Sequence, residues 1–306
     1  MLFNVKDNVV QEVKEQPFKS EKELQTLCEN NLQKLINLEF VDTEFSVADF
    51  RLDTVAFDKE VNSFVIIEYK NQRNVSVIDQ GYTYLSTMFN HKADFVLRHN
   101  IKFHDNKDLN DFDWSQSRVI FISPNFTKYQ INSINFKDLP IELWKIKRYQ
   151  NNTISFEQIV SANSDESIKS IAPILDTDIK QEVSKETKTY SEKELIDVAD
   201  DCIVDIYNEL KEYILGLDDN ITLKPTKLYI GFNRGRKSVV SIKLQKKSLV
   251  LWINTEPNTL NDPKKIIKDV TNIGHHGNGN SQINISNTED IGYIEDLLKC
   301  FICNII

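Results

Sequence analysis

The sequence contains few of the residues that mark secreted or membrane proteins. Its four cysteines, Cys28, Cys202, Cys300 and Cys303, are spaced neither as a disulfide framework nor as a closed zinc site. No apolar run approaches the roughly 20 residues that cross a membrane, and the N-terminus lacks a signal-peptide pattern. We therefore expect a cytoplasmic protein whose cysteines pack as small apolar side chains.

Basic residues are also fewer than acidic residues. Lysine and arginine number 37 against 46 acidic residues, which gives a formal net charge of −9. Because nonspecific nucleic-acid binding depends on Lys and Arg that neutralise phosphates, the surface as a whole does not favour it, and any such contact must be local. With 40% hydrophobic and 27% charged residues, the composition is globular, and 306 residues suffice for two domains.

Two domains are expected on either side of a polar segment. Residues 161–190 are rich in Ser, Thr and charge and indicate a linker that can be ordered in part. Residues 1–160 alternate strand and helix patterns, with short strands expected at 94–98 and 118–122, and indicate an α/β domain with a central sheet flanked by helices. Residues 191–306 indicate a smaller α+β domain.

Two neighbouring predicted strands become charged where an apolar run ends. Residues 50–58 and 62–70 are enriched in Val, Ile, Phe and Thr, and a loop of hairpin length joins them. Side chains alternate along a strand, so Glu68 and Lys70 project from the same face. Asp53 on the partner strand can reach that end of the sheet, and two carboxylates and an ammonium then converge.

This combination of side chains indicates hydrolysis of phosphodiesters. Close carboxylates repel each other unless they share a proton or a divalent cation. Oxygen ligands suit Mg²⁺ or Mn²⁺, and a lysine beside the ion can orient an attacking water. The alternative is an ordinary strand with a solvated Glu-x-Lys ion pair.

A helix expected from Ser76 to Asn90 adds a polar group to the same region. Its face carries Gln80 and Tyr84 at i and i+4 among apolar residues. A glutamine that points inward with apolar neighbours needs a hydrogen-bond partner.

Together, these motifs resemble the PD-(D/E)XK nuclease superfamily. The similarity covers residues 18–98 and is to the branch with an R-I-D-like strand, here Arg51-Leu-Asp53, an E-x-K strand, here Glu68-Tyr-Lys70, and a Q-x-x-x-Y helix, here Gln80 to Tyr84. It implies a restriction-endonuclease-like fold and a Mg²⁺- or Mn²⁺-dependent nuclease that acts on DNA more than RNA.

The resemblance also implies roles for single residues. Asp53 and Glu68 would ligate the metal together with the carbonyl of Tyr69, Lys70 would position the water, and Gln80 would hydrogen-bond near the site. Superfamily members often act as dimers, which makes a homodimer one expectation.

An acidic residue on the preceding helix completes the metal site in this superfamily, and both Glu21 and Glu23 are candidates. Ser20 supplies an N-cap, and Glu23 then occupies the N3 position of a capping box. Because capping gives Glu23 a structural role, Glu21 is the better candidate for the metal.

The second domain contains a locally basic stretch. With Tyr229, Phe232 and Trp252 interleaved, it could follow a phosphate backbone and stack bases, whereas the alternative is that alternate strand positions simply face water. The candidate contacts are Arg234, Arg236, Lys237, Lys246 and Lys247.

The half of the chain from about Tyr190 resembles a small domain of uncharacterised function found at the C-terminal end of nuclease-like chains. The resembling segments are 229–236 and 269–279, and the second is glycine-rich and contains His275-His276. We expect a structural loop role for this double histidine. The alternative to a nuclease is a catalytically inactive nucleic-acid-binding or protein-interaction module on a nuclease fold.

Overall fold

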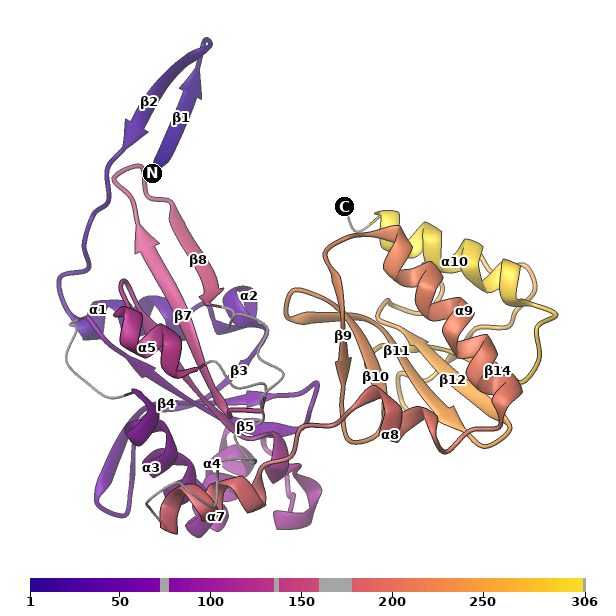
Figure 1. The fold of residues 1–306 in the computed structure, drawn as a ribbon, viewed down its shortest axis with the longest axis horizontal. Helices are drawn as coiled ribbons and strands as arrows, with labels where there is room; N and C mark the ends of the chain where they lie inside the picture. Colours follow the sequence, from indigo (N-terminus) through magenta and orange to yellow (C-terminus); the bar gives the residue numbers. More distant parts are fainter. Residues whose placement is uncertain (72–76, 135–137, 160–177, 305–306) are drawn as a thin grey trace. The chain divides into compact units, whose positions relative to one another are not determined.

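A computed structural model describes residues 1–71, 77–134, 138–159 and 178–304 (Figure 1). The chain divides into two compact units, Met1–Thr189 and Tyr190–Ile306, and each contains its own sheet. Within the described ranges, every helix is too short or too polar to traverse a lipid bilayer.

The first unit is built on a six-stranded mixed sheet with the strand order β3-β4-β5-β6-β7-β8. Strand β4 is antiparallel to both β3 and β5, β6 is parallel to both β5 and β7, and β8 is antiparallel to β7. The strands are β3 (Glu39–Val47), β4 (Phe50–Asp58), β5 (Ser63–Tyr69), β6 (Arg118–Ser123), β7 (Ile141–Arg148) and β8 (Ile154–Ile159).

Helices cover both faces of this sheet. On one face, α1 (Glu21–Glu29) and α2 (Leu32–Ile36) pack on side chains such as Ile67 of β5. The other face carries α3 (Val77–Asn90) and α4 (Lys92–Phe103). The unit is therefore α/β with a central mixed sheet flanked by helices, as predicted, and this architecture is consistent with a restriction-endonuclease-like fold. Its shorter helices are η1 (Leu109–Asp111), η2 (Trp114–Gln116) and α5 (Lys128–Ser133).

One prediction for this unit was wrong. Residues 94–98 lie inside helix α4 and do not form a strand. The predicted linker 161–190 includes helix α7 (Asp178–Glu186), which packs against α3 and buries Val183 in the same core. The polar composition did not indicate this helix, because Val183 is the one side chain that it buries. The rest of the predicted linker, up to residue 177, lies outside the described residues.

A separate hairpin begins the chain. Strands β1 (Leu2–Lys6) and β2 (Val9–Val13) pair only with each other among the described strands, and they project from the sheet of the first unit in Figure 1. The hairpin contributes nothing to the cores on which the candidate site depends.

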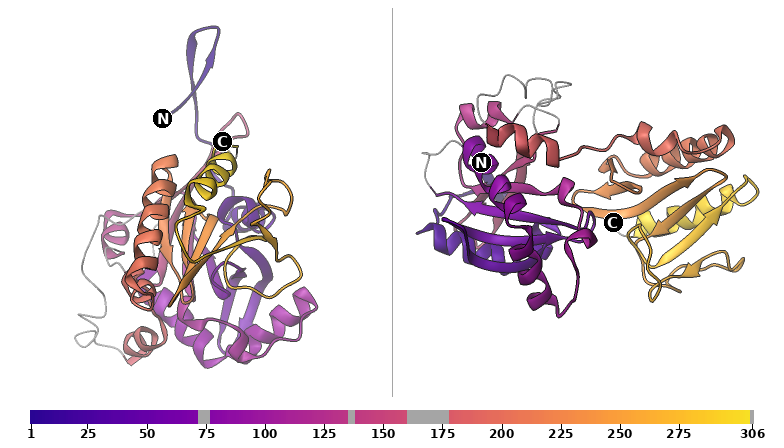
Figure 2. Two further views of the ribbon diagram at one scale, coloured as in Figure 1. Left: turned by 90° about the vertical axis from the view of Figure 1, so that its right-hand side faces the viewer. Right: turned by 90° about the horizontal axis from the view of Figure 1, so that it is seen from below.

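The second unit is α+β, as expected. Its antiparallel sheet has the order β13-β14-β12-β11-β10-β9, and helices α9 (Asp201–Leu217) and α10 (Ile291–Asn304) pack together over one face (Figure 2). Helix α8 (Glu192–Ile196) precedes them. The strands are β9 (Ile221–Pro225), β10 (Ile230–Arg234), β11 (Lys237–Gln245), β12 (Ser248–Ile253), β13 (Lys268–Asp269) and β14 (Ser281–Ile285).

Candidate functional site

Asp53 lies where the pairing of β4 with β5 ends. The last pair in that ladder is Thr54 with Ile67. One residue further, the Asp53 carboxylate takes the place of a main-chain acceptor, and its Oδ2 accepts a 3.0 Å hydrogen bond from the N–H of Tyr69. Asp53 is thus tied to β5 beside Glu68, as the strand pattern predicted.

Glu68 is buried on the face of the sheet that carries α3. Its Oε1 accepts hydrogen bonds from Lys70 Nζ at 2.6 Å and from Gln80 Nε2 at 2.9 Å. Its Oε2 is buried and has no hydrogen-bond partner. One oxygen of this carboxylate is therefore hydrogen-bonded, and the other is buried without a partner. A bound cation would supply the missing partner of the second oxygen.

The proximity of the two acids changes the protonation of Asp53. Burial, followed by repulsion from Glu68, raises the pKa of Asp53 to about 6, although the Tyr69 N–H and the Lys70 charge act in the opposite direction. The repulsion between two carboxylates in a partly buried space is relieved when a proton or a divalent cation binds between them. The donor set therefore fits a hard cation such as Mg²⁺ or Mn²⁺, which accepts one or two carboxylates and keeps several waters.

Gln80 links the strand to the α3 helix. Besides Glu68, its Nε2 donates to the hydroxyl of Tyr84 at 2.8 Å. Burial, with the nearby Glu68 charge, raises the pKa of Tyr84 to about 12, so this hydroxyl stays protonated at neutral pH. The inward glutamine predicted from the helix pattern thus has its partner, and that partner is the site carboxylate.

The structure separates the two candidate helix acids. Glu23 accepts from the N–H of Lys19 at 2.6 Å and forms an ion pair with Arg148 at 2.7 Å. Glu21 instead accepts a 2.9 Å hydrogen bond from the N–H of Asn71, just beyond the end of β5. Glu23 is thus engaged with Lys19 and Arg148, whereas Glu21 contacts the residue that follows Lys70.

Glu21 does not, however, join Asp53 and Glu68 in a compact ligand group. Across the described residues, no three His, Cys, Asp or Glu side chains gather closely enough to hold a metal ion. The structure thus brings together Asp53, Glu68, Lys70 and Gln80. Glu21 and the Tyr69 carbonyl as metal ligands stay predictions.

Sequence reasoning missed a polar layer beneath Asp53. Gln25 of α1 is buried, and its Nε2 donates to the carbonyl of Asp53 at 2.8 Å and to Glu29 Oε1 at 3.0 Å. The hydroxyl of Thr54 donates to the same Glu29 oxygen at 2.6 Å. The sequence pattern that identified Gln80 could also have identified Gln25. In both cases a glutamine lies next to the apolar positions of a helix that packs on the sheet.

The predicted nucleic-acid contacts in the second unit do not form one patch. Arg236 and Lys237 lie at the β10–β11 turn, whereas Lys246 and Lys247 lie at the β11–β12 turn. A nine-residue strand separates these turns, a distance of roughly 25–30 Å. Arg234 forms an ion pair with Asp218. The count of charges along the sequence did not reveal that they flank opposite ends of β11.

The expected stacking aromatics are also unsuitable. Phe232 is fully buried, and Tyr229 and Trp252 expose 5% and 3% of their surface. Phe232 packs in the core under α9 and α10, while Trp252 packs with Val250 on the opposite face. The prediction that these three rings stack bases was therefore wrong.

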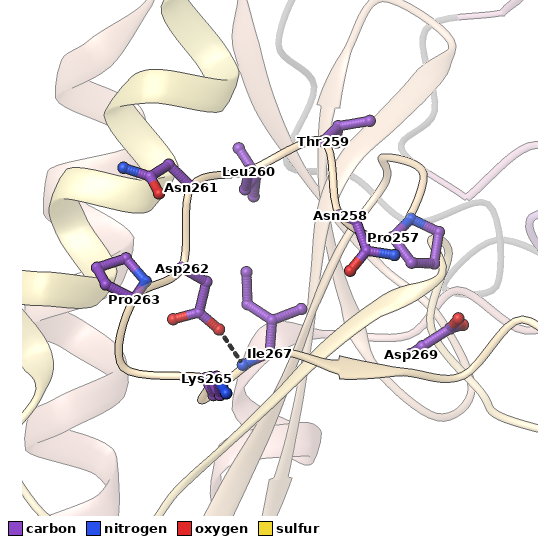
Figure 3. A pocket seen from close by; sticks show the side chains of 10 residues that line it. All are labelled: Pro257, Asn258, Thr259, Leu260, Asn261, Asp262, Pro263, Lys265, Ile267 and Asp269. Atoms are coloured by element: carbon purple, nitrogen blue, oxygen red, sulfur yellow. Dashed lines mark hydrogen bonds between the residues drawn. The ribbon is translucent and has the colours of Figure 1, made fainter.

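A hollow of about 680 Å³ in the second unit has no comparable chemistry (Figure 3). Asp262, which lines it, accepts from the N–H of Ile267 at 2.8 Å and from the hydroxyl of Tyr293 at 2.7 Å. Asp269 at its edge accepts from the N–H of Thr271 at 2.9 Å. Hydrogen bonds from Ile267, from Tyr293 of α10 and from Thr271 thus hold both acids, so the Asp53–Glu68 pair remains the candidate site.

Comparison with known proteins identifies a close relative. The chain is 43% identical over 300 residues to an uncharacterised protein of Haemophilus influenzae, and the match covers 97% of this chain and 98% of the relative. The chain belongs to the same family as that protein. Residues 188–299 match the family model described as a domain of unknown function, DUF5655.

Solved structures show only distant likeness. A repair endonuclease from Pyrococcus abyssi is 17% identical with a TM-score of 0.28, over 43% of this chain and 50% of that one. The EndoMS–dsDNA2 complex is 15% identical with a TM-score of 0.25, over 44% and 48%. The match spans about half of each of these proteins.

Proposed function

We propose that this protein is a metal-dependent nuclease that hydrolyses phosphodiester bonds, with DNA favoured over RNA. The observation that carries the proposal is the convergence of Asp53, Glu68 and Lys70 at the end of β5, with the Oε2 of Glu68 buried and without a hydrogen-bond partner. A structural ion pair alone has no need of the second carboxylate.

The metal would be Mg²⁺ or Mn²⁺, held by Asp53 and Glu68, with the carbonyl of Tyr69 and Glu21 as the further proposed ligands. When bound, such a cation lowers the pKa of a coordinated water and stabilises charge on the phosphoryl oxygens. The raised pKa of Asp53 supports this assignment, because burial and, second to it, the charge of Glu68 disfavour the ionised carboxylate, and a bound cation would offset both effects.

Lys70, Gln80 and the N–H of Tyr69 would have separate roles beside the metal. The ammonium of Lys70 would orient the attacking water and offset charge that develops on the phosphate. Gln80 would hold Glu68 in one rotamer through its 2.9 Å hydrogen bond. The N–H of Tyr69 would do the same for Asp53, so both carboxylates are oriented before substrate binds.

One observation favours a second candidate, an inactive binding or interaction module on the nuclease fold. The 2.6 Å contact between Lys70 and Glu68 is already a complete ion pair. A site that uses Lys70 only to neutralise Glu68 would preserve the fold without cleaving a substrate.

A cleavage assay separates the two candidates. Single-stranded, double-stranded and branched DNA and a matched RNA would be incubated with the wild type in Mg²⁺ or Mn²⁺. The variants Asp53→Asn and Lys70→Met should each lose cleavage by at least about 100-fold. The matched controls are Asp49→Asn and Lys59→Met, whose parent side chains are exposed.

Cleavage that is unchanged in Asp53→Asn would assign any activity to another site or to a contaminant. Absence of cleavage on every substrate, together with intact folding, would favour the inactive module.

A further inference from the structure

The sheet of the second unit has two chemically different faces. Side chains such as Ile230, Ile242 and Leu251 point toward α9 and α10 and form the core. Their neighbours along the strands point to the other face, where Val250 and Trp252 pack with Val270 in a cluster that includes no described helix of this unit. The sheet register defines which residues share that second face.

A single row crosses all six strands on this face. The register pairs Lys224 with Gly231, Gly231 with Ser241, Ser241 with Trp252, Trp252 with Gln282, and Gln282 with Lys268. Cross-strand partners in antiparallel sheets project to the same side, so Lys224 and Lys268 lie at the two ends of the row. With about 4.8 Å between strands, these ends are roughly 24 Å apart.

Lys243 adds a third cation between them. It lies two residues beyond Ser241 on β11, and its cross-strand partner is Val250, which packs with Trp252 on this face. We call the surface formed by Lys224, Lys243 and Lys268 the lysine face.

The glycine-rich loop closes over the middle of the row. A Cβ at Gly277 would collide with the indole of Trp252, and the N–H of Asn278 donates to Ser241 Oγ at 3.1 Å. The Nδ2 of Asn278 also donates to the hydroxyl of Tyr229 at 3.0 Å. The loop therefore needs glycine for close approach to the sheet, and it joins the two segments that the sequence singled out.

This loop brings two histidines to the lysine face. The ring of His275 stacks on Trp252 with centroids 6.2 Å apart. His276 lies near Lys243, and burial together with the Lys243 charge lowers the pKa of His276, so this imidazole is neutral at neutral pH. Neutral imidazole and ammonium groups are both suitable donors to phosphate oxygens.

The helical side of the same unit has the opposite charge. Acidic residues predominate on α9 and α10 over Lys211 and Lys299. The pKa of Glu295 is raised by burial and by the nearby charges of Glu209 and Asp296, as expected for a group of like charges. The acids are Asp201, Asp205, Glu209, Glu212, Glu295 and Asp296.

We propose that the lysine face binds the sugar-phosphate backbone of a nucleic acid, with the acidic helices turned away from it. The basis of the proposal is charge complementarity with a polyanion. The lysines are distributed along a row of roughly 24 Å, and each strand of DNA presents a phosphate about every 3.4 Å, so several phosphates can lie along the row. The site differs from the five basic residues predicted from the sequence, and it does not depend on hydrolysis at Asp53 and Glu68.

The test compares two sets of substitutions that remove the same charge. The full-length chain would be titrated into a fluorescent DNA duplex in the presence of EDTA, and binding followed by anisotropy. The first variant combines Lys224→Gln, Lys243→Gln and Lys268→Gln. The control combines Lys237→Gln, Lys246→Gln and Lys247→Gln at the two ends of β11.

We expect the first variant to lose at least about tenfold in affinity, with a slope of log Kd against log salt that is smaller by about 1 for each lysine removed. The control should lose less than about threefold. Circular dichroism would verify folding, and the single variant Lys243→Gln provides a milder test with a loss of a few-fold.

Three outcomes would overturn the proposal. Equal losses in both triple variants would indicate a general charge effect, and no loss in the first variant would exclude the lysine face. Displacement of DNA by poly-glutamate at equal charge concentration would identify an acidic protein as the ligand class. Because the assay contains no divalent metal, failure of the nuclease proposal would not alter any of these results.

Discussion

The Oδ2 atom of Asp53 accepts a 3.0 Å hydrogen bond from the main-chain N–H of Tyr69. This contact continues the β4–β5 ladder one step beyond Thr54 and Ile67 with a side chain in place of a carbonyl. It holds a carboxylate beside the buried Glu68, and burial together with the repulsion from Glu68 raises the pKa of Asp53 to about 6. The geometry of the strand end thus creates an electrostatic cost that a cation can relieve.

Asp53→Asn should raise thermal stability above pH 6 and leave it unchanged near pH 4. The pKa of Asp53 is about 6 in the folded protein and lies near the ordinary value of about 3.9 in the unfolded chain. Between these values only the unfolded chain releases its proton, so the free energy of unfolding decreases as pH rises and stays lowered above pH 6. Asparagine keeps an acceptor for Tyr69 but cannot ionise.

Thermal melts at pH 4 and pH 7.5, with Asp49→Asn as the exposed control, would measure this effect. A lower Tm for Asp53→Asn at pH 7.5 would show that the Asp53 carboxylate is structural.

Substitution of the two helix acids should separate activity from stability. Glu23→Gln removes the ion pair with Arg148, so it should lower the Tm slightly and leave cleavage intact. Glu21→Gln keeps an acceptor for the N–H of Asn71, so the Tm should be unchanged while cleavage falls at least about tenfold. Melting curves and initial rates on one substrate would decide. The reverse pattern would assign the helix acid to Glu23.

Gln80→Leu should impair turnover through Glu68. The change removes the donor to Glu68 Oε1 and to the Tyr84 hydroxyl, which frees the carboxylate to change rotamer. We expect kcat to fall about tenfold or more with KM nearly unchanged, because Gln80 acts on a carboxylate and not on the substrate.

Gln33→Leu on α2, where the glutamine is exposed, is the matched control. A change in KM alone would contradict this positioning role for Gln80.

Gln25→Leu should destabilise the first unit. Its side-chain amide donates to the Asp53 carbonyl, to Glu29 and to Thr43, and leucine would leave the half-buried acceptors of Asp53 and Glu29 without that donor. The expected cost is about 1–3 kcal/mol in the free energy of unfolding. Urea denaturation, again with Gln33→Leu as the control, would measure it. Wild-type stability would show that solvent replaces Gln25 as the donor.

Strand periodicity was sufficient to predict the centre of the site. The strand predicted at 50–58 forms with those bounds, and the strand predicted at 62–70 forms at Ser63–Tyr69. Alternation correctly placed Glu68 and Lys70 together, and helical spacing turned Gln80 toward them. These relations follow from local geometry with periods of 2 and 3.6 residues, so the sequence contains them directly.

Relations that depend on tertiary packing could not be predicted. Residues 94–98 include Phe95 and Val96, and so short an apolar run does not distinguish a strand from a helix. In the structure, Phe95 packs between Phe45 and Phe64, with ring centroids 5.1 and 5.7 Å away, and α4 forms. Likewise, sheet register decides whether a lysine lies on a strand face or at a strand end. Counting basic residues along the sequence does not contain that information.

A metal site at Asp53 and Glu68 can be tested by calorimetric titration of Mn²⁺ into the wild type and into Asp53→Asn. We expect one or two sites in the wild type at pH 7.5, weaker binding below pH 6 where protons compete for Asp53, and loss of binding in Asp53→Asn. Asp49→Asn should bind as the wild type does. Equal Mn²⁺ binding by the wild type and Asp53→Asn, or no binding by the wild type even with DNA present, would contradict a metal site at Asp53 and Glu68.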